Sequence, residues 1–592
     1  MIKDKPCIVQ RDRTILLEVD HPGFEEAREQ LSRYADLVKS PPSFHTYRIT
    51  PLSLWNAASS GWNAEQICGN LQSLSRWDVP AALIEEITRL VSRYGQLTLL
   101  KHSERDQWLI LRSDDIELMN EIRNQQALSK TGLTFLTDTE AEISAERRGV
   151  LKQELTRLGY PVMDYAGYQD GQFLHIRWRG ETEETGEAAR ECRMDNRSPF
   201  RLRDYQKEAA ETFRDSGGKG GSGVLVLPCG AGKTIIGMAA MRELECETLI
   251  LTSNTTSVRQ WVAELRDKTT LQAHEIGEYT GQRKEVRPVT VATYQILTHR
   301  HRKEDELRHM KLFNERSWGL IIYDEVHLLP APVFRATADI QATRRLGLTA
   351  TLVREDGREH DVFSLIGPKR YEMPWKSLEN KGWIASVDCV EVRVPMPDRL
   401  KEKCLYAGTR EQYRLASENP AKIEVVKRLL RHHSDAQTLI IGQYLDQLEL
   451  VSSELGAPLI SGQMPQSQRN DLYEAFRKGE QRVLVVSKVA NFAVDLPDAS
   501  VAVEISGSFG SRQEEAQRLG RILRPKADDN RAYFYALVSQ DSREEVFALR
   551  RQLFLIEQGY RYRTVTEPHI LDASSQANED DIEPGKEASG TT

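Results

Sequence analysis

Short runs of β-branched and other apolar residues alternate with helical patterns from about residue 199 to residue 563. One group of runs lies at 224–227, 248–251, 289–292, 320–323 and 345–348, and another at 438–441, 483–486 and 502–505. Strands that alternate with helices form βαβ units, whose parallel sheets are covered on both faces. The sequence therefore predicts two α/β domains in tandem, over residues 199–385 and 386–566.

The rest of the chain predicts smaller units, because 592 residues exceed what one hydrophobic core can hold. Residues 1–112 are expected to form a mainly helical domain, with a helix over 24–37, a helix start at Thr50-Pro51 and a helix over 80–94. Two β-like runs follow at 97–100 and 108–111, which fits either a winged-helix-like unit or a helical cap with a hairpin. Beyond this domain we expect a small mixed α/β domain at 113–180, a polar linker at 181–198 and a disordered tail at 574–592.

Composition limits the class of protein. No run approaches the roughly 18–20 apolar residues of a membrane span, and the first residues lack the apolar stretch of a signal peptide. The seven cysteines are scattered, with no pair at metal-ligand spacing. We therefore expect a cytoplasmic protein that contacts no membrane. The net charge of −8 argues mildly against coating nucleic acid by charge alone, but it allows a locally basic groove.

The segment LPCGAGKT at residues 227–234 follows an apolar strand and opens a helical run. Glycines in such a loop let backbone N–H groups converge on phosphates, and the helix start adds positive charge. Lys233 is expected to reach the β- and γ-phosphates of a nucleotide, and the Thr234 hydroxyl to hold Mg²⁺. The full loop pattern has glycine where this chain has Leu227, so a glycine-rich turn without a ligand is the alternative. The expected phosphate-binding residues are Gly230, Ala231, Gly232, Lys233 and Thr234.

Two carboxylates end a later strand, in the sequence LIIYDEVH at residues 320–327. Such a pair suits metal-assisted phosphoryl transfer, in which Asp324 holds Mg²⁺ and Glu325 orients and activates the attacking water. Acidic residues at strand ends are common, but their position after the phosphate loop favours the catalytic interpretation.

Arginines recur in QRLGRILR at residues 517–524. On a helix Arg518, Arg521 and Arg524 share roughly one face, which suits binding of phosphate oxygens. A solvated basic helix is the alternative. Because arginine can stabilise transition-state charge from across an interface, we expect the second sheet to bring these side chains to a nucleotide held by the first.

Taken in order and at these intervals, PCGAGKT, DEVH, LTAT at 348–351 and QRLGRILR resemble the motifs of superfamily 2 helicases. The segments RDYQ at 203–206, LTATLVRED at 348–356, SKVANFAVDLP at 487–497 and SRQEEAQRLGRILRPK at 511–526 resemble the XPB family, the helicases related to xeroderma pigmentosum group B protein. That family shares the leucine at 227. The resemblance covers about residues 199–562, and the amino-terminal segment also looks like the leading domain of bacterial members. It implies two RecA-like domains, ATP as the fuel and 3′→5′ movement on DNA.

The resemblance also implies roles for individual residues. Gln206 would read adenine. The residues that would face the γ-phosphate are Gln517, Arg521 and Arg524. Those that would couple hydrolysis to movement are His327, Thr349 and Thr351. The triplet Arg354, Glu355 and Asp356 matches an element that the family uses in opening DNA, with a surface ion-pair cluster as the alternative.

Contacts to the nucleic acid are expected in loops at the tops of both sheets, where phosphate contacts hold a strand without reading its sequence. Any of these residues could instead be an ordinary loop or cap residue. The candidates by motif position are Ser257, Arg259, Gln260, Thr280, Gly281, Thr293, Ser461, Gly462, Ser487 and Lys488.

Three functions compete at this point. The leading one is an ATP-dependent 3′→5′ DNA helicase, in a DNA repair setting. The second is a translocase on double-stranded DNA that remodels protein–DNA complexes without separating strands. The third is a nucleotide-regulated scaffold acting through residues 1–180, which the presence of Lys233, Asp324, Glu325 and Arg521 disfavours. An RNA track is disfavoured by the resemblance. We expect a monomer, and the resemblance implies a nuclease or a repair or transcription protein as partner.

Overall fold

The computed structural model describes residues 5–41, 43–180, 200–215, 221–228, 230–299, 308–341, 343–350, 359–487, 499–507, 530–560 and 562–566. The chain divides into two compact units, Met1–Trp375 and Lys376–Thr592. The division falls at the start of α14 (Trp375–Asn380), before the boundary expected at 385. The reason is that α14 packs on the second unit: the Lys376 ammonium lies over the Tyr560 ring, and Glu379 accepts a hydrogen bond from Ser386.

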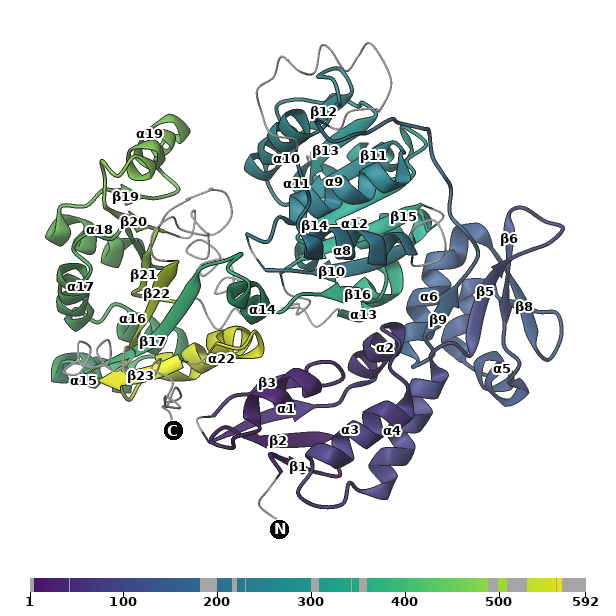
Figure 1. Cartoon of the computed structure of the whole chain (residues 1–592), viewed down its shortest axis with the longest axis horizontal. Helices are drawn as coiled ribbons and strands as arrows, with labels where there is room; N and C mark the ends of the chain where they lie inside the picture. Colours follow the sequence, from purple (N-terminus) through teal and green to yellow (C-terminus); the bar gives the residue numbers. More distant parts are fainter. Residues whose placement is uncertain are drawn as a thin grey trace, which may run out of the picture. The chain divides into compact units, whose positions relative to one another are not determined.

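The first unit begins with an antiparallel sheet and its helices (Figure 1). The strand order is β1-β2-β4-β3, with β1 Cys7–Val9, β2 Thr14–Glu18, β3 Asp36–Lys39 and β4 Phe44–Arg48. The helices are α1 Phe24–Leu31, α2 Pro51–Ser59, α3 Ala64–Leu74 and α4 Ala81–Arg93. The predicted start of α2 is confirmed, since the Thr50 hydroxyl accepts from the Ser53 amide and Pro51 is the first helical residue. The helix expected over 24–37 instead ends at Leu31, because pairing with β4 draws Asp36–Lys39 into the sheet and buries Leu37.

A second sheet follows, with the order β7-β8-β6-β5-β9. Its strands are β5 Leu97–Lys101, β6 Trp108–Arg112, β7 Thr134–Phe135, β8 Glu140–Ser144 and β9 Val162–Asp164, and its helices are α5 Ile116–Arg123 and α6 Arg148–Arg157. The hairpin of β5 and β6 pairs with β9 and β8. It therefore belongs to this sheet and is not a wing on the preceding helices, because its buried leucines need Ala141 and Ile143 of β8 to complete a core.

The third sheet of this unit is parallel, with the order β12-β13-β11-β14-β15-β10-β16 (Figure 1, teal). Its strands are β10 Ser222–Val226, β11 Thr248–Thr252, β12 Ile276–Tyr279, β13 Val289–Thr293, β14 Leu320–Asp324, β15 Arg344–Thr349 and β16 Lys369–Glu372. Its helices include α8 Asp204–Asp215, α9 Lys233–Leu244, α10 Thr255–Lys268, α11 Tyr294–Thr298, α12 Ala331–Asp339 and α13 Glu359–Asp361. Every residue of β10, β11 and β13 is buried, as expected for strands covered on both faces.

Helix α6 of the second sheet packs directly on α12 of the third. A Cβ at Gly149 would overlap the Ala338 backbone, so only glycine fits this contact. Beside it, Asp164 pairs with Arg148 at 2.7 Å and with Lys152 at 2.9 Å. The Lys152 ammonium also donates to Gln341 at 3.0 Å, and burial lowers the pKa of Lys152 to about 8. These contacts join the second and third sheets within the first unit.

The second unit contains another parallel sheet, with the order β19-β20-β18-β21-β22-β17-β23. Its strands are β17 Ser386–Val394, β18 Thr438–Ile441, β19 Leu459–Ile460, β20 Val483–Val486, β21 Val501–Glu504, β22 Arg531–Ser539 and β23 Tyr562–Thr566. Its helices include α15 Asp398–Tyr406, α16 Thr409–Ser417, α17 Ala421–His432, α18 Leu445–Leu455, α19 Gln466–Arg477 and α22 Arg543–Glu557. Two parallel α/β sheets in tandem confirm the predicted RecA-like fold class. Of the described helices, none combines the length and apolar character that a bilayer crossing requires.

Candidate active site

Strand order in the first unit brings the separate motifs to one edge of the sheet. Strand β15 lies between β10 and β14, so the carboxyl ends of the three strands are adjacent. The Leu227 amide donates to the Thr349 carbonyl at 2.9 Å, which joins the phosphate-binding loop to LTAT. Asp324 of DEVH is the last residue of β14, and Glu325 follows it. Ligands of parallel sheets generally bind at this carboxyl edge.

The loop after β10 has the backbone that phosphate binding requires. Gly230 and Gly232 have φ values of +83° and +78°, which favour glycine, and α9 begins at Lys233. The Ala231 carbonyl accepts hydrogen bonds from the Tyr205 hydroxyl at 2.8 Å and from the Gln206 amide at 3.1 Å. The RDYQ segment therefore lies against the loop.

Lys233 and Glu325 meet although they come from different motifs. The Lys233 ammonium lies 3.0 Å from Oε1 of Glu325, and both side chains are largely buried. Nδ1 of His327 lies 3.5 Å from the other oxygen of Glu325 and 2.8 Å from the Thr349 hydroxyl. Glu325 has a φ of +51°, which is unusual for a residue with a side chain and is typical of strained functional positions. Polar contacts thus connect three motifs, through Lys233, Glu325, His327 and Thr349.

Asp324 is held by donors from β11 and from the helices α10 and α11. Its Oδ2 accepts from the Trp261 indole at 2.9 Å and from the Thr252 hydroxyl at 3.4 Å. Its carbonyl accepts from the Tyr294 hydroxyl at 2.9 Å. Burial, and then the adjacent Glu325, raise the pKa of Asp324 to about 6. Neighbouring buried carboxylates of this kind are stabilised by a cation.

The residues present fit a magnesium ion bound together with a nucleotide. Among the described residues, no cluster of three or more His, Cys, Asp or Glu side chains could hold a metal on its own. Magnesium, however, is usually held by one or two carboxylates together with substrate phosphates. Asp324 and the Thr234 hydroxyl, in the first turn of α9, supply such a set.

The expected nucleic-acid contacts of the first unit follow β11, β12 and β13, which are adjacent in the sheet. Arg259 and Gln260 are exposed in the second turn of α10, and Ser257 is partly exposed. Thr280 and Thr293 are buried: Thr280 accepts from the Gln282 amide, and Thr293 caps α11. Gly281 follows Thr280 with nothing within 4 Å of its absent Cβ. The exposed side chains are thus confined to α10.

In the second unit, Ser461 and Gly462 follow β19, and Ser487 follows β20. The Ser487 amide donates to the Ile460 carbonyl at 3.0 Å, so these positions are neighbours. Ser487 is buried, Ser461 is partly exposed and Gly462 is exposed. The expected site residues that lie outside the described residues are Thr351, Arg354, Glu355, Asp356, Lys488, Gln517, Arg521 and Arg524.

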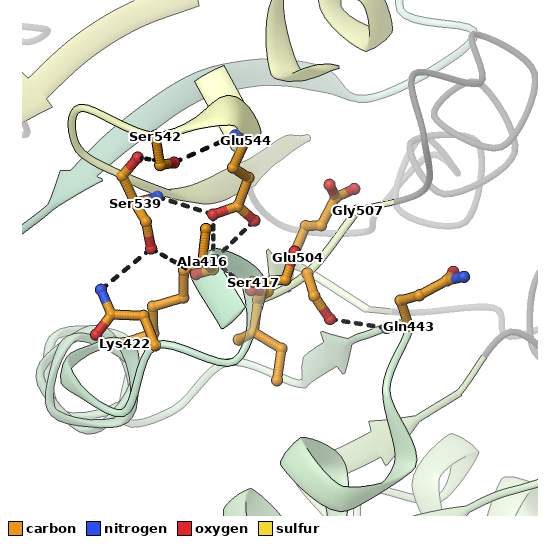
Figure 2. Close-up of polar contacts among 12 residues, drawn as sticks. Ala416, Ser417, Lys422, Gln443, Glu504, Gly507, Ser539, Ser542 and Glu544 are labelled. Carbon is orange, nitrogen blue, oxygen red and sulfur yellow. Dashed lines mark hydrogen bonds and ion pairs between the residues drawn. The ribbon is translucent and has the colours of Figure 1, made fainter. Parts of the chain in front are cut away.

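A buried ionic network lies where β21 ends (Figure 2). The Lys422 ammonium donates to both oxygens of Glu544 at 2.8 Å and to the Ile505 carbonyl at 2.9 Å. Glu504 pairs with Arg551 at 2.9 Å, and a Cβ at Gly507 would overlap both side chains. Burial lowers the pKa of Lys422 below its ordinary value, although the adjacent Glu544 opposes this effect. The network fixes residues 504–507, immediately before the segment that carries the expected arginines.

Comparison with known proteins identifies the family. The model for the ERCC3/RAD25/XPB C-terminal helicase matches residues 378–586, and the model described as type III restriction enzyme, res subunit, matches residues 199–354. A model described as helicase conserved C-terminal domain matches residues 7–137. The DNA 3′-5′ helicase XPB of Mycobacterium tuberculosis is 52% identical over 562 residues, which cover 94% of this chain and 97% of the relative. The chain belongs to the XPB helicase family.

Other XPB relatives extend over the same length. The DNA 3′-5′ helicase XPB of Kineococcus radiotolerans is 51% identical, covering 95% of this chain and 96% of its own. The general transcription and DNA repair factor IIH helicase/translocase subunit XPB of Antonospora locustae is 33% identical, covering 95% of this chain and 81% of its own. The XPB resemblance seen in the motifs is thereby confirmed over 94–95% of the chain.

Sequence reasoning missed three side chains of this XPB site: Trp261, Tyr294 and Tyr205. Trp261 and Tyr294 stand next to residues singled out as nucleic-acid contacts, but no motif marks them as partners of Asp324. Tyr205 lies inside RDYQ and could have been named from that segment. Its hydroxyl reaches the loop only through packing of α8 on α9.

Proposed function

We propose that this chain is an ATP-dependent 3′→5′ DNA helicase of the XPB type. The observation that carries the proposal is the identity of 52% across 94% of the chain with a DNA 3′-5′ helicase. It is supported by the convergence of Lys233, Asp324 and Glu325 at the carboxyl ends of β10 and β14. DNA is the proposed partner, and cytoplasm the proposed location.

In this proposal Mg²⁺ neutralises charge on the ATP phosphates when it is bound. Gly230, Gly232 and Lys233 bind the phosphates, while Thr234 and Asp324 bind the metal. A triphosphate gives the Lys233 ammonium new anionic partners, which releases Glu325 to orient water. Gln206, beside the loop, would contact the adenine. Gln517, Arg521 and Arg524 would complete the site from the second unit.

The contact from Glu325 through His327 to Thr349 offers a route from hydrolysis to movement. Thr349 ends β15 and is followed by the segment with Thr351 and the triplet Arg354, Glu355 and Asp356. We propose that a change at Glu325 reaches this segment through His327, and that the triplet acts in opening the duplex.

A translocase that does not separate strands is the second candidate. It is favoured by the names of the eukaryotic relatives, which are called helicase/translocase subunits of general transcription and DNA repair factor IIH. Those names also support a protein partner from repair or transcription. In this candidate the nucleotide site works as described above, and only the use of the motion differs.

Matched duplexes carrying a 3′ tail, a 5′ tail or blunt ends, in DNA and RNA versions, test both candidates. The helicase proposal expects ATP-dependent unwinding of the 3′-tailed DNA alone. Removal of a bound protein or a triplex strand from blunt DNA, without unwinding of any duplex, would favour the translocase. Unwinding of the 5′-tailed or RNA substrate would contradict the proposed polarity or track.

A further inference from the structure

Trp261 contacts both elements of the nucleotide site from a helix that is not part of it. Its indole N–H donates to Oδ2 of Asp324 at 2.9 Å. The far edge of its ring packs on Gly237, where an added Cβ would lie only 2.6 Å from the ring. Gly237 is on α9, one turn after Lys233. The side chain therefore touches the helix that follows the phosphate loop and the carboxylate of DEVH.

The Trp261 ring is held in one position. It is 1% exposed, and Val258, Val262 and Leu265 of the same helix are buried beside it. Thr252, at the end of the strand that leads into α10, donates to the same Oδ2. Strand β11 and helix α10 thus place two donors on one oxygen of Asp324. A shift of α10 would therefore shift that carboxylate.

Helix α10 also carries exposed polar side chains. Arg259 and Gln260 directly precede Trp261 and are exposed. A guanidinium and an amide in a second helical turn can contact phosphates and sugars, the groups that a motor grips without reading sequence. One helix therefore presents a polar exposed surface and, at the next residue, a buried donor to Asp324.

A second aromatic side chain also donates to Asp324, from the helix that follows β13. Thr293 caps α11, and Tyr294, the first residue of that helix, donates its hydroxyl to the Asp324 carbonyl at 2.9 Å. Tyr294 is 3% exposed. In α10, which follows β11, and at the end of the adjacent strand β13, a candidate nucleic-acid contact thus directly precedes an aromatic donor to Asp324.

We infer that Trp261, supported by Tyr294, is a positioning residue that transmits nucleic-acid binding at α10 to the metal-binding carboxylate Asp324. Strand binding at Arg259 and Gln260 moves α10, and the indole N–H moves Oδ2 of Asp324 into the arrangement that holds the metal nucleotide. This inference rests on the proposed function, since it presumes that the ligand of α10 is a nucleic-acid strand.

The test measures linkage between the two ligands in the full chain. Trp261→Phe keeps an aromatic ring at this position but removes the N–H. The dissociation constant of a magnesium-bound, non-hydrolysable ATP analogue is measured with and without saturating single-stranded DNA. The reciprocal constant for DNA is measured with and without the analogue, because coupling between two sites must be equal in both directions. The ratio of DNA-stimulated to DNA-free ATP hydrolysis is a second readout.

Trp318→Phe is the matched control. Its indole is also buried in the same sheet domain and donates to a backbone carbonyl, that of Leu312, at 2.9 Å. Trp318→Phe therefore removes the same kind of hydrogen bond without removing a donor to Asp324. Tyr294→Phe, which removes only a hydroxyl, provides an independent variant should Trp261→Phe fold poorly.

We expect Trp261→Phe to lower the DNA-dependent ratio of analogue affinities by on the order of tenfold, within the usual range of site-to-site coupling. Tyr294→Phe should lower it by a smaller factor, and Trp318→Phe should leave it unchanged. An unchanged ratio in Trp261→Phe, or an equal loss of affinity with and without DNA, would overturn the inference, because the indole would then only support Asp324. If DNA changes neither ATP hydrolysis nor analogue affinity in the wild-type chain, that result would instead contradict the proposed function.

Discussion

The ammonium of Lys233 lies 3.0 Å from the carboxylate of Glu325, so the two groups assigned to phosphate and to water are paired with each other. In the proposed reaction each group is needed elsewhere, Lys233 at the phosphates and Glu325 at the attacking water. The pair keeps both charges neutralised in a largely buried site, where an unpaired charge is costly. In the proposed function, entry of a triphosphate would exchange this partner of Lys233 for phosphate oxygens.

Glu325→Gln should separate nucleotide binding from turnover. The amide keeps the side-chain shape but cannot activate water, so hydrolysis should fall by about 10²–10⁴-fold. Affinity for the magnesium-bound nucleotide should be retained or increased, because Lys233 loses a competing anion. Binding of a fluorescent ATP analogue and steady-state phosphate release measure the two effects. Glu243→Gln, at an ion pair on the surface of the same domain, is the control; unchanged hydrolysis in Glu325→Gln would remove its assigned role.

The arginines of the second unit should act on the same nucleotide as Lys233. Arg521→Ala and Arg524→Ala should each depress catalysis, with an arginine finger worth on the order of 10³–10⁵ in rate. A double-mutant cycle with Lys233→Ala should be strongly non-additive, as for residues that work as one unit. Arg550→Ala, an exposed arginine of α22, should have no such effect. Additive losses would indicate a basic helix far from the nucleotide.

Replacing Arg354, Glu355 and Asp356 together with alanine should separate ATP use from strand opening. DNA-stimulated hydrolysis should persist, because Lys233 and Glu325 are untouched. Unwinding should fall sharply, since opening costs roughly 1.4 kcal/mol of stacking per base-pair step. Both activities are measured on one preparation with a 3′-tailed duplex. A parallel loss of both, or no change in either, would contradict the strand-opening role.

The buried pair of Lys422 and Glu544 should be a strong determinant of stability in the second unit. Lys422→Met leaves Glu544 buried without its cation, which costs about 3–5 kcal/mol. Lys427→Met on the same helix removes only exposed pairs with Glu424 and Glu454, which solvent screens, so it should change stability far less. Thermal unfolding compares the variants. The double change Lys422→Met and Glu544→Met should recover much of the loss, and equal effects of the two lysine variants would contradict this ranking.

His433 should make stability depend on pH in the weakly acidic range. Burial, and then His432, lower the pKa of His433 to about 4, and its Nε2 lies 2.8 Å from the Tyr535 hydroxyl. The unfolded chain binds this proton more readily, so the contribution is full above the ordinary pKa of about 6.5 and declines as the pH falls toward 4. Unfolding midpoints at pH 7.5 and 5 should differ less in His433→Gln than in the wild type. His432→Gln, which changes an exposed ring, should retain most of the wild-type difference.

Local patterns predicted the elements whose causes are local. The Thr50-Pro51 helix start and the helix that ends before Gly95 have the expected bounds, because caps and apolar spacing lie within a few residues of each other. The motifs at Lys233 and Asp324 could be placed for the same reason. Strand β17 was missed, because its buried Glu391 and partly buried Arg393 interrupt the apolar run. The Glu391 carboxylate accepts a hydrogen bond from Gln552 of α22.

Contacts between residues far apart in the sequence could not be predicted from local patterns. Lys422 and Glu544 are 122 positions apart, and Trp261 and Asp324 are 63 apart. Each pair is created by strand order, which a single sequence does not reveal. The same holds for the hairpin of β5 and β6, whose partners β8 and β9 depend on how the chain returns to it. Sequence therefore located the chemical groups, while packing determined which of them meet.

The order of the parallel strands in the first unit matters for redesign. Under the proposed function, loops that follow β12 and β13, apart from Tyr294, could be grafted from another motor to alter the grip on the strand. Loops that follow β10 and β14 would be retained so that ATP hydrolysis is preserved. Strand β11 borders both groups, since it pairs with β13 on one side and with β14 on the other. A graft that includes α10 would therefore import a foreign regulation of ATP turnover together with a new grip, unless the recipient's tryptophan at 261 is retained.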